Sequence, residues 1–151
     1  MNWIHQSAEI ENIDQIPESA IAFIYLITCI NETASQYNRF YVGRKMLASN
    51  RKVRLTKKEK LLPENKRKIF KRVIKETDWK DYWGSSKELL EDIKLLGKES
   101  FKREILCFTS SKSDTSFYEM FYQMKMNVLF ENSYNGHIAN TKFFKGKISQ
   151  L

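Results

Sequence analysis

Apolar and β-branched residues gather in a few short stretches of this 151-residue chain. Residues 20–30 (AIAFIYLITCI) predict a buried strand, and residues 101–108 (FKREILCF) predict another. The short run 39–43 (RFYVG) follows the first strand after a polar connection, which predicts an antiparallel hairpin. Residues 1–20 are mostly polar and contain Pro17, so we interpret them as a lead-in that no helix runs through.

Apolar residues recur at helical spacing in the remaining segments. Residues 64–76 (ENKRKIFKRVIKE) predict a helix with a basic face, and residues 55–62 predict a shorter helix before it. Residues 85–96 predict a helix that Gly97 ends. Residues 116–129 predict an amphipathic helix after a polar loop.

The order strand, strand, basic helix, helix, strand, helix predicts one small α/β domain over residues 1–151. Its core would be a central three-stranded antiparallel sheet flanked by helices. At about 100° per residue, the last helix places Glu119 opposite an apolar face. The apolar face consists of Phe117, Met120, Phe121, Met124 and Val128.

The net charge of +8 is concentrated in one block. Residues 44–80 hold 15 Lys/Arg and 4 Asp/Glu, a net of +11, so the remaining chain carries −3. Such a block, which we interpret as a basic insertion in the domain, favours a polyanionic partner. The other interpretation is a solvated basic helix that binds nothing. The candidate nucleic-acid-binding residues of the block are Arg51, Lys52, Arg54, Arg67, Lys68, Lys71 and Arg72.

The two cysteines, Cys29 and Cys107, lie in apolar surroundings far apart in sequence. Without a CxxC motif or a Cys/His cluster, they predict free thiols in a reducing compartment and argue against structural zinc. No apolar run reaches the length of a membrane span. The first ten residues lack a basic segment followed by an apolar one. We therefore expect a non-secreted, cytoplasmic protein with no membrane partner.

Three short motifs lie in a suggestive order. Tyr25 ends an Ile-Tyr pair, and 16 residues later Tyr41 opens a Tyr-Val-Gly run. Together they resemble the paired-strand signature of the GIY-YIG nuclease superfamily, with Phe23 in place of the first Gly and Val42 in place of the Ile. The stretch from Tyr82 (YWGSSKELL), followed by a glycine and a Phe-rich strand, is similar to phage-borne and homing-type members of that superfamily.

The resemblance implies a metal-dependent DNA endonuclease that uses Mg²⁺ or Mn²⁺. It implies that Glu119 is the metal ligand, that Tyr25 and Tyr41 orient or deprotonate the attacking water, and that Asn135 orients the site or contacts substrate. One carboxylate on a rigid helix is enough to anchor Mg²⁺, because the substrate phosphate supplies further ligands. Structural roles stay open for all four residues. Glu119 could close a capping box with Ser116, the tyrosines could pack in the core, and Asn135 could simply form a turn.

The sequence departs from the family pattern at the catalytic arginine. The resemblance places that residue on the helix after the Tyr-Val-Gly strand, but helix 85–96 carries acidic residues instead. The preferred replacements are Arg44 and Lys45, directly after the Tyr-Val-Gly run. Arg51 and Arg54 are the alternatives.

A second function fits the same scaffold. The chain could be a catalytically inactive nucleic-acid-binding module, or less simply a basic interaction protein. The enzyme hypothesis requires that Tyr25, Tyr41, a cation and Glu119 converge on one surface. His137 is an alternative base. One compact site would need two protomers or two binding events to cut both strands of DNA, so a homo-oligomer stays open.

Overall fold

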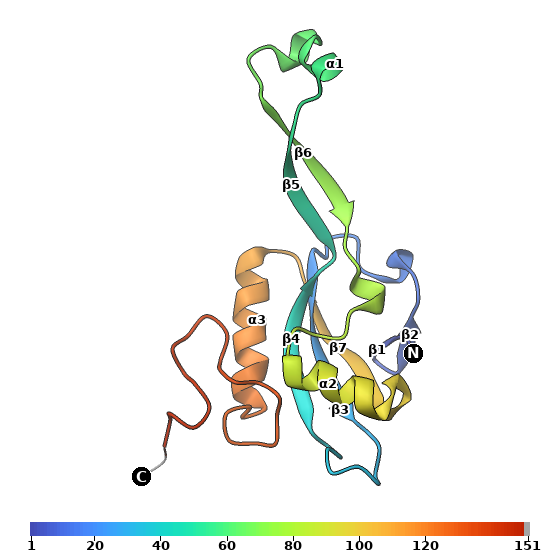
Figure 1. Cartoon of the computed structure of the whole chain (residues 1–151), viewed down its shortest axis with the longest axis vertical. Helices are drawn as coiled ribbons and strands as arrows, with labels where there is room; N and C mark the ends of the chain where they lie inside the picture. Colours follow the sequence, from blue (N-terminus) through green and yellow to red (C-terminus); the bar gives the residue numbers. More distant parts are fainter. Residues whose placement is uncertain (150–151) are drawn as a thin grey trace.

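The computed structural model describes residues 1–149 and contains a five-stranded mixed sheet in the order β2-β1-β7-β3-β4 (Figure 1). Strand β3 is antiparallel to both β4 and β7, while β1 pairs parallel to β7. The predicted three-stranded antiparallel sheet is therefore present, but it is only part of a larger sheet. The strands of the sheet are β1 (Trp3–His5), β2 (Ala8–Ile10), β3 (Ala22–Cys29), β4 (Phe40–Met46) and β7 (Phe101–Thr109).

The N-terminal segment was wrongly predicted to be a lead-in, since it forms β1 and β2. Trp3 is 1% exposed and lies opposite Ile10 in the β1–β2 pair. Its indole Nε1 donates a hydrogen bond of 2.7 Å to the carbonyl of Trp79. Strands of three residues are too short to show a period-2 pattern. The only hint of them in the sequence is Trp3, a large apolar residue in a polar segment.

The central strand β3 is covered on both faces, which explains its continuous apolar sequence. Phe23, Tyr25 and Ile27 pack on one face in a cluster with residues of α2 (Lys87–Leu96). Ile24 packs on the other face in a cluster with residues of α3 (Lys112–Lys125). The two helices thus lie on opposite faces of the sheet, and β4 is the edge strand between them.

The predicted helix 85–96 is confirmed as α2. The Ser86 hydroxyl caps it by accepting a hydrogen bond from the Leu89 amide, and Gly97 ends it with φ 86°. Helix α3 begins earlier than predicted, because Ser111 rather than Ser116 is its N-cap. The alternative of a Ser116–Glu119 capping box is therefore wrong.

The apolar side chains of α3 lie on one side, and much of that side is exposed. Phe117 is 53% exposed, Phe121 41% and Met124 56%, whereas Glu119 and Gln123 are buried. The polar side of α3 therefore faces the sheet edge. The buried polar residues of this helix find partners on β4, as described below.

The basic insertion forms a second sheet instead of the predicted helix over residues 64–76. Strands β5 (Ala48–Arg54) and β6 (Phe70–Glu76) pair antiparallel and extend away from the body along its long axis (Figure 1). Every residue of β6 is exposed. The spacing of its apolar residues is therefore not set by contacts with a core, and it could not tell a helix from a strand. At the tip, α1 (Lys57–Lys60) is capped by Thr56 and confirms the predicted short helix in reduced length.

Four 3-10 turns complete the described chain. They are η1 (Ile13–Gln15), η2 (Pro63–Asn65), η3 (Trp79–Asp81) and η4 (Lys98–Ser100). Within residues 1–149, no helix is both long enough and apolar enough to cross a membrane.

Candidate active site

Tyr25 and Tyr41 lie on the same face of the β3–β4 hairpin. Tyr25 is paired with Gly43, and side chains alternate along β4, so positions 41 and 43 share the face of Tyr25. The two tyrosine rings lie 6.1 Å apart between centroids. A Cβ atom at Gly43 would lie 2.5 Å from the Tyr25 hydroxyl oxygen. The glycine of the Tyr-Val-Gly run is therefore needed because the ring of Tyr25 crosses over it.

The environments of the two tyrosines differ. Tyr25 is 1% exposed, and burial, followed by the neighbouring Tyr41 and Tyr82, raises its pKa well above 10. Burial also raises the pKa of Tyr41, although its hydroxyl lies 3.1 Å from the Ser85 hydroxyl. Both are neutral at pH 7, so each acts as a hydrogen-bonding group rather than as a phenolate.

Ser85 reaches Tyr41 because of the turn that precedes α2. Gly84 has φ 93°, a conformation that other residues rarely adopt. A Cβ atom at Gly84 would also lie 3.4 Å from the Tyr41 ring. The Trp-Gly-Ser-Ser sequence thus combines a tight turn, a close approach to Tyr41 and the N-cap of α2. Sequence reasoning recognised this motif but did not assign Ser85 to the site.

Arg44 and Glu119 meet on the other side of the hairpin. The Arg44 Nε lies 3.3 Å from a carboxylate oxygen of Glu119, and its Nη1 donates a hydrogen bond of 3.0 Å to the Ser116 hydroxyl. The Glu119 side chain is 12% exposed. Burial raises its pKa above the ordinary value of 4.5, while Arg44 and His137 oppose that shift. Glu119 is therefore a largely desolvated carboxylate whose salt-bridge partner is Arg44.

A pocket of about 370 Å³ joins the two sides of β4. Because β4 is the edge strand, side chains from its two faces can meet around its outer edge. Tyr41 approaches from the α2 side and Glu119 from the α3 side. The pocket is lined by Tyr41, Ser85, Ser86, Glu119, Gln123, Tyr134, Asn135, Gly136, His137 and Ala139. Tyr25 lies behind Tyr41 and does not line it.

The raised pKa of Glu119 predicts how stability depends on pH. Since folding raises this pKa, the folded state binds more protons than the unfolded state between 4.5 and the raised value. The contribution of Glu119 to the free energy of unfolding therefore decreases as pH rises through that interval. Glu119→Gln should remove this decrease and be at least as stable as the parent at neutral pH. Urea unfolding from about pH 5 to about pH 8 measures it. A clearly less stable Gln variant at neutral pH would show that the ionised carboxylate stabilises the fold.

Asn135 and Gln123 hold the outer edge of β4. The Val42 amide donates a 2.9 Å hydrogen bond to the Asn135 side-chain oxygen, and the Asn135 amide donates one of 2.8 Å back to the Val42 carbonyl. The Gln123 side chain donates a third bond, of 3.1 Å, to the same carbonyl. These buried amides fix the backbone next to Tyr41. Sequence reasoning did not single out Gln123, because only the fold brings it to Val42.

The structure separates the four candidate cations. Lys45 lies 2.5 Å from an Asp78 carboxylate oxygen and 3.9 Å from the centre of the Tyr82 ring, away from Glu119. Arg51 and Arg54 lie on β5 of the projecting hairpin. Arg44 is thus the candidate cation that contacts Glu119.

The pocket offers a single carboxylate, which suits a divalent cation that takes its other ligands from phosphate and water. Within residues 1–149, no three Asp, Glu, His or Cys side chains cluster closely enough to form an all-protein metal cage. Mg²⁺ needs only one or two protein carboxylates when phosphate and water complete its ligands. Glu119 is such a carboxylate, and His137 lines the same pocket.

A family-model match shows that the chain is a GIY-YIG domain, the class of nuclease domain that its motifs resemble. More narrowly, the chain belongs to the SegE_GIY-YIG family, described as "Putative endonuclease segE, GIY-YIG domain", which matches residues 3–148. No curated protein and no solved structure matches the chain.

Proposed function

We propose that this protein is a DNA endonuclease that requires Mg²⁺ or Mn²⁺ and cuts phosphodiester bonds in the pocket at the edge of β4. The observation that supports it most directly is that the Tyr41 hydroxyl and the Glu119 carboxylate, from opposite faces of the sheet, line one pocket. The family match supports an endonuclease. The basic hairpin supports a polyanionic substrate.

Side chains of the pocket, together with Arg44 beside it, have separate roles in this proposal. Glu119 would hold the divalent cation, which when bound supplies charge to the scissile phosphate. Arg44 neutralises further negative charge on the phosphate, because its guanidinium forms paired hydrogen bonds with phosphate oxygens. Tyr41 would hold the attacking water by a hydrogen bond, and its own hydroxyl is held by its contact with Ser85. His137 is the group in the pocket that would accept the proton of that water.

Tyr25 and Asn135 act on the site indirectly in this proposal. Tyr25 packs against Tyr41 with 6.1 Å between ring centres and limits how that ring can turn. Asn135 holds the Val42 backbone from both sides of its peptide group. Both are positioning residues in this proposal. The Asn135 amide is bonded to Val42, and the Tyr25 ring is buried, so neither needs to touch substrate.

Removing the metal tests the proposal. An end-labelled DNA duplex should stay intact with the protein in EDTA and should be cut when excess Mg²⁺ or Mn²⁺ is restored, because the pocket supplies only one carboxylate. Products are counted on a denaturing gel. Equal cutting in EDTA would contradict a metal-dependent site. Tight binding without cutting in either metal would instead favour the catalytically inactive nucleic-acid-binding module.

A further inference from the structure

The projecting hairpin carries almost all of the excess charge of the protein. Residues 48–76 hold 12 Lys/Arg and 3 Asp/Glu, a net of +9, so the rest of the chain has a net of −1. Figure 1 shows that this hairpin extends well beyond the sheet and both packed helices. The charge is therefore held on a projecting arm, the β5–β6 ribbon and its tip, at a distance from the Glu119 pocket, with a net of +5 on the two strands and +4 on the tip that joins them.

The pairing within the ribbon places cations side by side. Lys52 lies directly opposite Arg72, so the two share a face. Like charges in that position destabilise a strand pair. Lys71 forms an ion pair with Glu59, and within the described chain no other basic residue of β5 or β6 has an acidic partner at salt-bridge distance. An anionic ligand between these side chains would relieve the repulsion.

On the face that Lys52 and Arg72 share, Phe70 and Ile74 lie on either side of Arg72 along β6 and are exposed as well. Ile74 is 73% exposed, and Phe70 is 51% exposed. A two-stranded hairpin is only marginally stable in water without a covered face. The mixture of cations and exposed apolar groups suits the major groove of DNA, which admits a two-stranded β-ribbon and offers both base-edge acceptors and thymine methyl groups.

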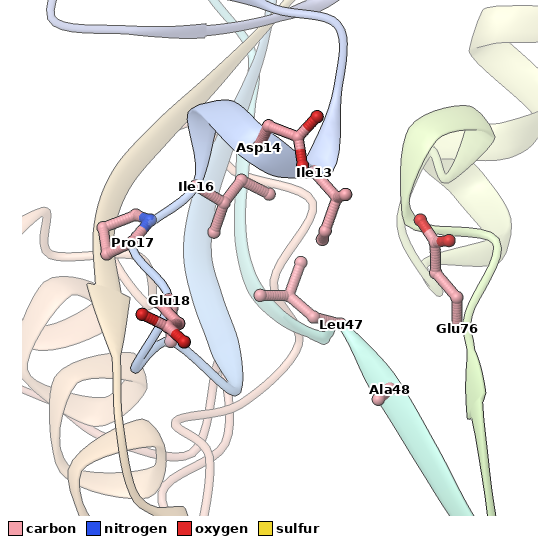
Figure 2. Close-up of a pocket in the computed structure, with 9 residues that line it drawn as sticks. Ile13, Asp14, Ile16, Pro17, Glu18, Leu47, Ala48 and Glu76 are labelled. Atoms are coloured by element: carbon pink, nitrogen blue, oxygen red, sulfur yellow. The ribbon is translucent and has the colours of Figure 1, made fainter.

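The root of the hairpin has an acidic side. A pocket of about 540 Å³ lies there, and Figure 2 shows Asp14 and Glu18 on one wall and Glu76 across from them. In the same view Leu47, which directly precedes β5, points toward Ile16. Both belong to the core cluster, so this end of the ribbon is packed against the body. These three carboxylates would repel a phosphate backbone.

The opposite side of the root is basic and leads to the active site. A second pocket there includes Arg44 and Lys112, together with Ser49, Asn50 and Ser116. Arg44 and Ser116 are hydrogen-bonded to each other, and Arg44 contacts Glu119. A phosphate backbone can therefore pass from the ribbon to the Glu119 pocket along the α3 side.

We infer that the β5–β6 ribbon lies in the major groove of duplex DNA to one side of the cleavage point, and that the phosphate backbone between them follows the Arg44–Lys112 side of the root. This inference rests on the proposed function. Seven residues of strand span about 24 Å, which corresponds to about seven base pairs. The protein would therefore contact duplex over at least about that length on one side of the cut.

Binding without cleavage tests the ribbon separately from the chemistry. Because Asn50 and Ile74 are paired, residues 51–73 can be replaced by an Asn-Gly turn that closes a shorter hairpin. A second variant, Lys52→Gln with Arg72→Gln, keeps the ribbon. Its control, Lys87→Gln with Lys94→Gln, removes the same charge from exposed positions of α2. Fluorescence anisotropy with a duplex of about 40 base pairs in EDTA gives affinity as a function of salt.

The ribbon-less variant should bind at least about tenfold more weakly. The Lys52/Arg72 variant should lose about one unit of log–log salt slope for each lost phosphate contact, and the α2 control should lose none. Methylation of guanine N7, a major-groove atom, should weaken binding of the parent but not of the ribbon-less variant. A duplex RNA of the same sequence should bind the parent more weakly, because its deep, narrow major groove excludes the ribbon.

The outcomes separate the two proposals. If these binding effects appear but the parent cuts no duplex in Mg²⁺, the ribbon assignment stands and the nuclease proposal fails. If the parent cuts DNA while both ribbon variants bind as the parent does, the ribbon assignment is wrong. Interference by adenine N3 methylation in place of guanine N7 would overturn the major-groove assignment, because that atom faces the minor groove.

Discussion

Glu119→Gln is expected to fold and to lose DNA cleavage by about 10²- to 10³-fold. The variant keeps the size of the side chain but cannot carry the negative charge that holds a divalent cation. A bound metal contributes several kcal/mol to stabilising the transition state, and each ~1.4 kcal/mol is tenfold in rate. Because ionised Glu119 is largely desolvated, its removal should not reduce stability at neutral pH. The measurement is the single-turnover rate on a labelled duplex.

Asp114→Asn is the matched control for this variant. Asp114 lies on the same helix, is exposed, and loses the same charge on substitution. Its cleavage rate should stay close to the parent value. If Glu119→Gln and Asp114→Asn cut equally fast, Glu119 is not the metal ligand, and the burial of its carboxylate serves only its contact with Arg44.

The second large effect is expected at the tyrosines, and it should be unequal. Tyr41→Phe removes a hydroxyl that reaches the pocket and would hold the attacking water, so the rate should fall by about 10²-fold, as expected when a reacting group is misplaced. Tyr25→Phe removes a hydroxyl that lies buried behind the pocket, so the rate should fall much less. The loss of the contact with Ser85 should cost Tyr41→Phe about 1 kcal/mol in the free energy of unfolding.

Single-turnover rates together with urea unfolding separate a catalytic from a structural effect at each position. Full activity of Tyr41→Phe would remove Tyr41 from the chemistry. A larger rate loss for Tyr25→Phe than for Tyr41→Phe would mean that the buried ring, and not the ring at the pocket, contacts the reacting groups.

The sequence predicted strands β3 and β7 and helix α2, whose own apolar residues are largely buried in the core. Residues 22–29 and 101–109 form the two long inner strands, and each sequence contains a run of at least four apolar residues. The ribbon was mistaken for a helix because β6 packs on no core, so the spacing of Ile69, Phe70, Val73 and Ile74 had no contact to define its period. The spacing of apolar residues does not predict secondary structure in a segment whose side chains pack against no core.

The candidate site was predictable only in part for a similar reason. The motifs identified Tyr25, Tyr41 and Glu119, and the position of Arg44 directly after Gly43 made it the preferred cation. That the pocket wraps around the edge of β4 depends on contacts between residues far apart in the chain. The bonds from Gln123 and Asn135 to Val42 span 81 and 93 residues, and no local pattern encodes them.

The order in which plasmid strands are cut follows from the number of pockets. The chain has one Tyr41–Glu119 pocket, so under the proposed function one binding event by one protomer would break one strand. Nicked circles should therefore appear before linear DNA. Linear product without a nicked intermediate would indicate two protomers acting together, which size-exclusion chromatography of the complex with DNA would detect.

The most direct measurement is the conversion of supercoiled plasmid by the parent protein and by Glu119→Gln, each with Mg²⁺ and with EDTA. The proposed site predicts nicked and then linear DNA only for the parent protein with Mg²⁺, and intact supercoiled plasmid in the other three reactions. Supercoiled plasmid that persists with the parent in Mg²⁺, or nicking by Glu119→Gln at the parent rate, would contradict it.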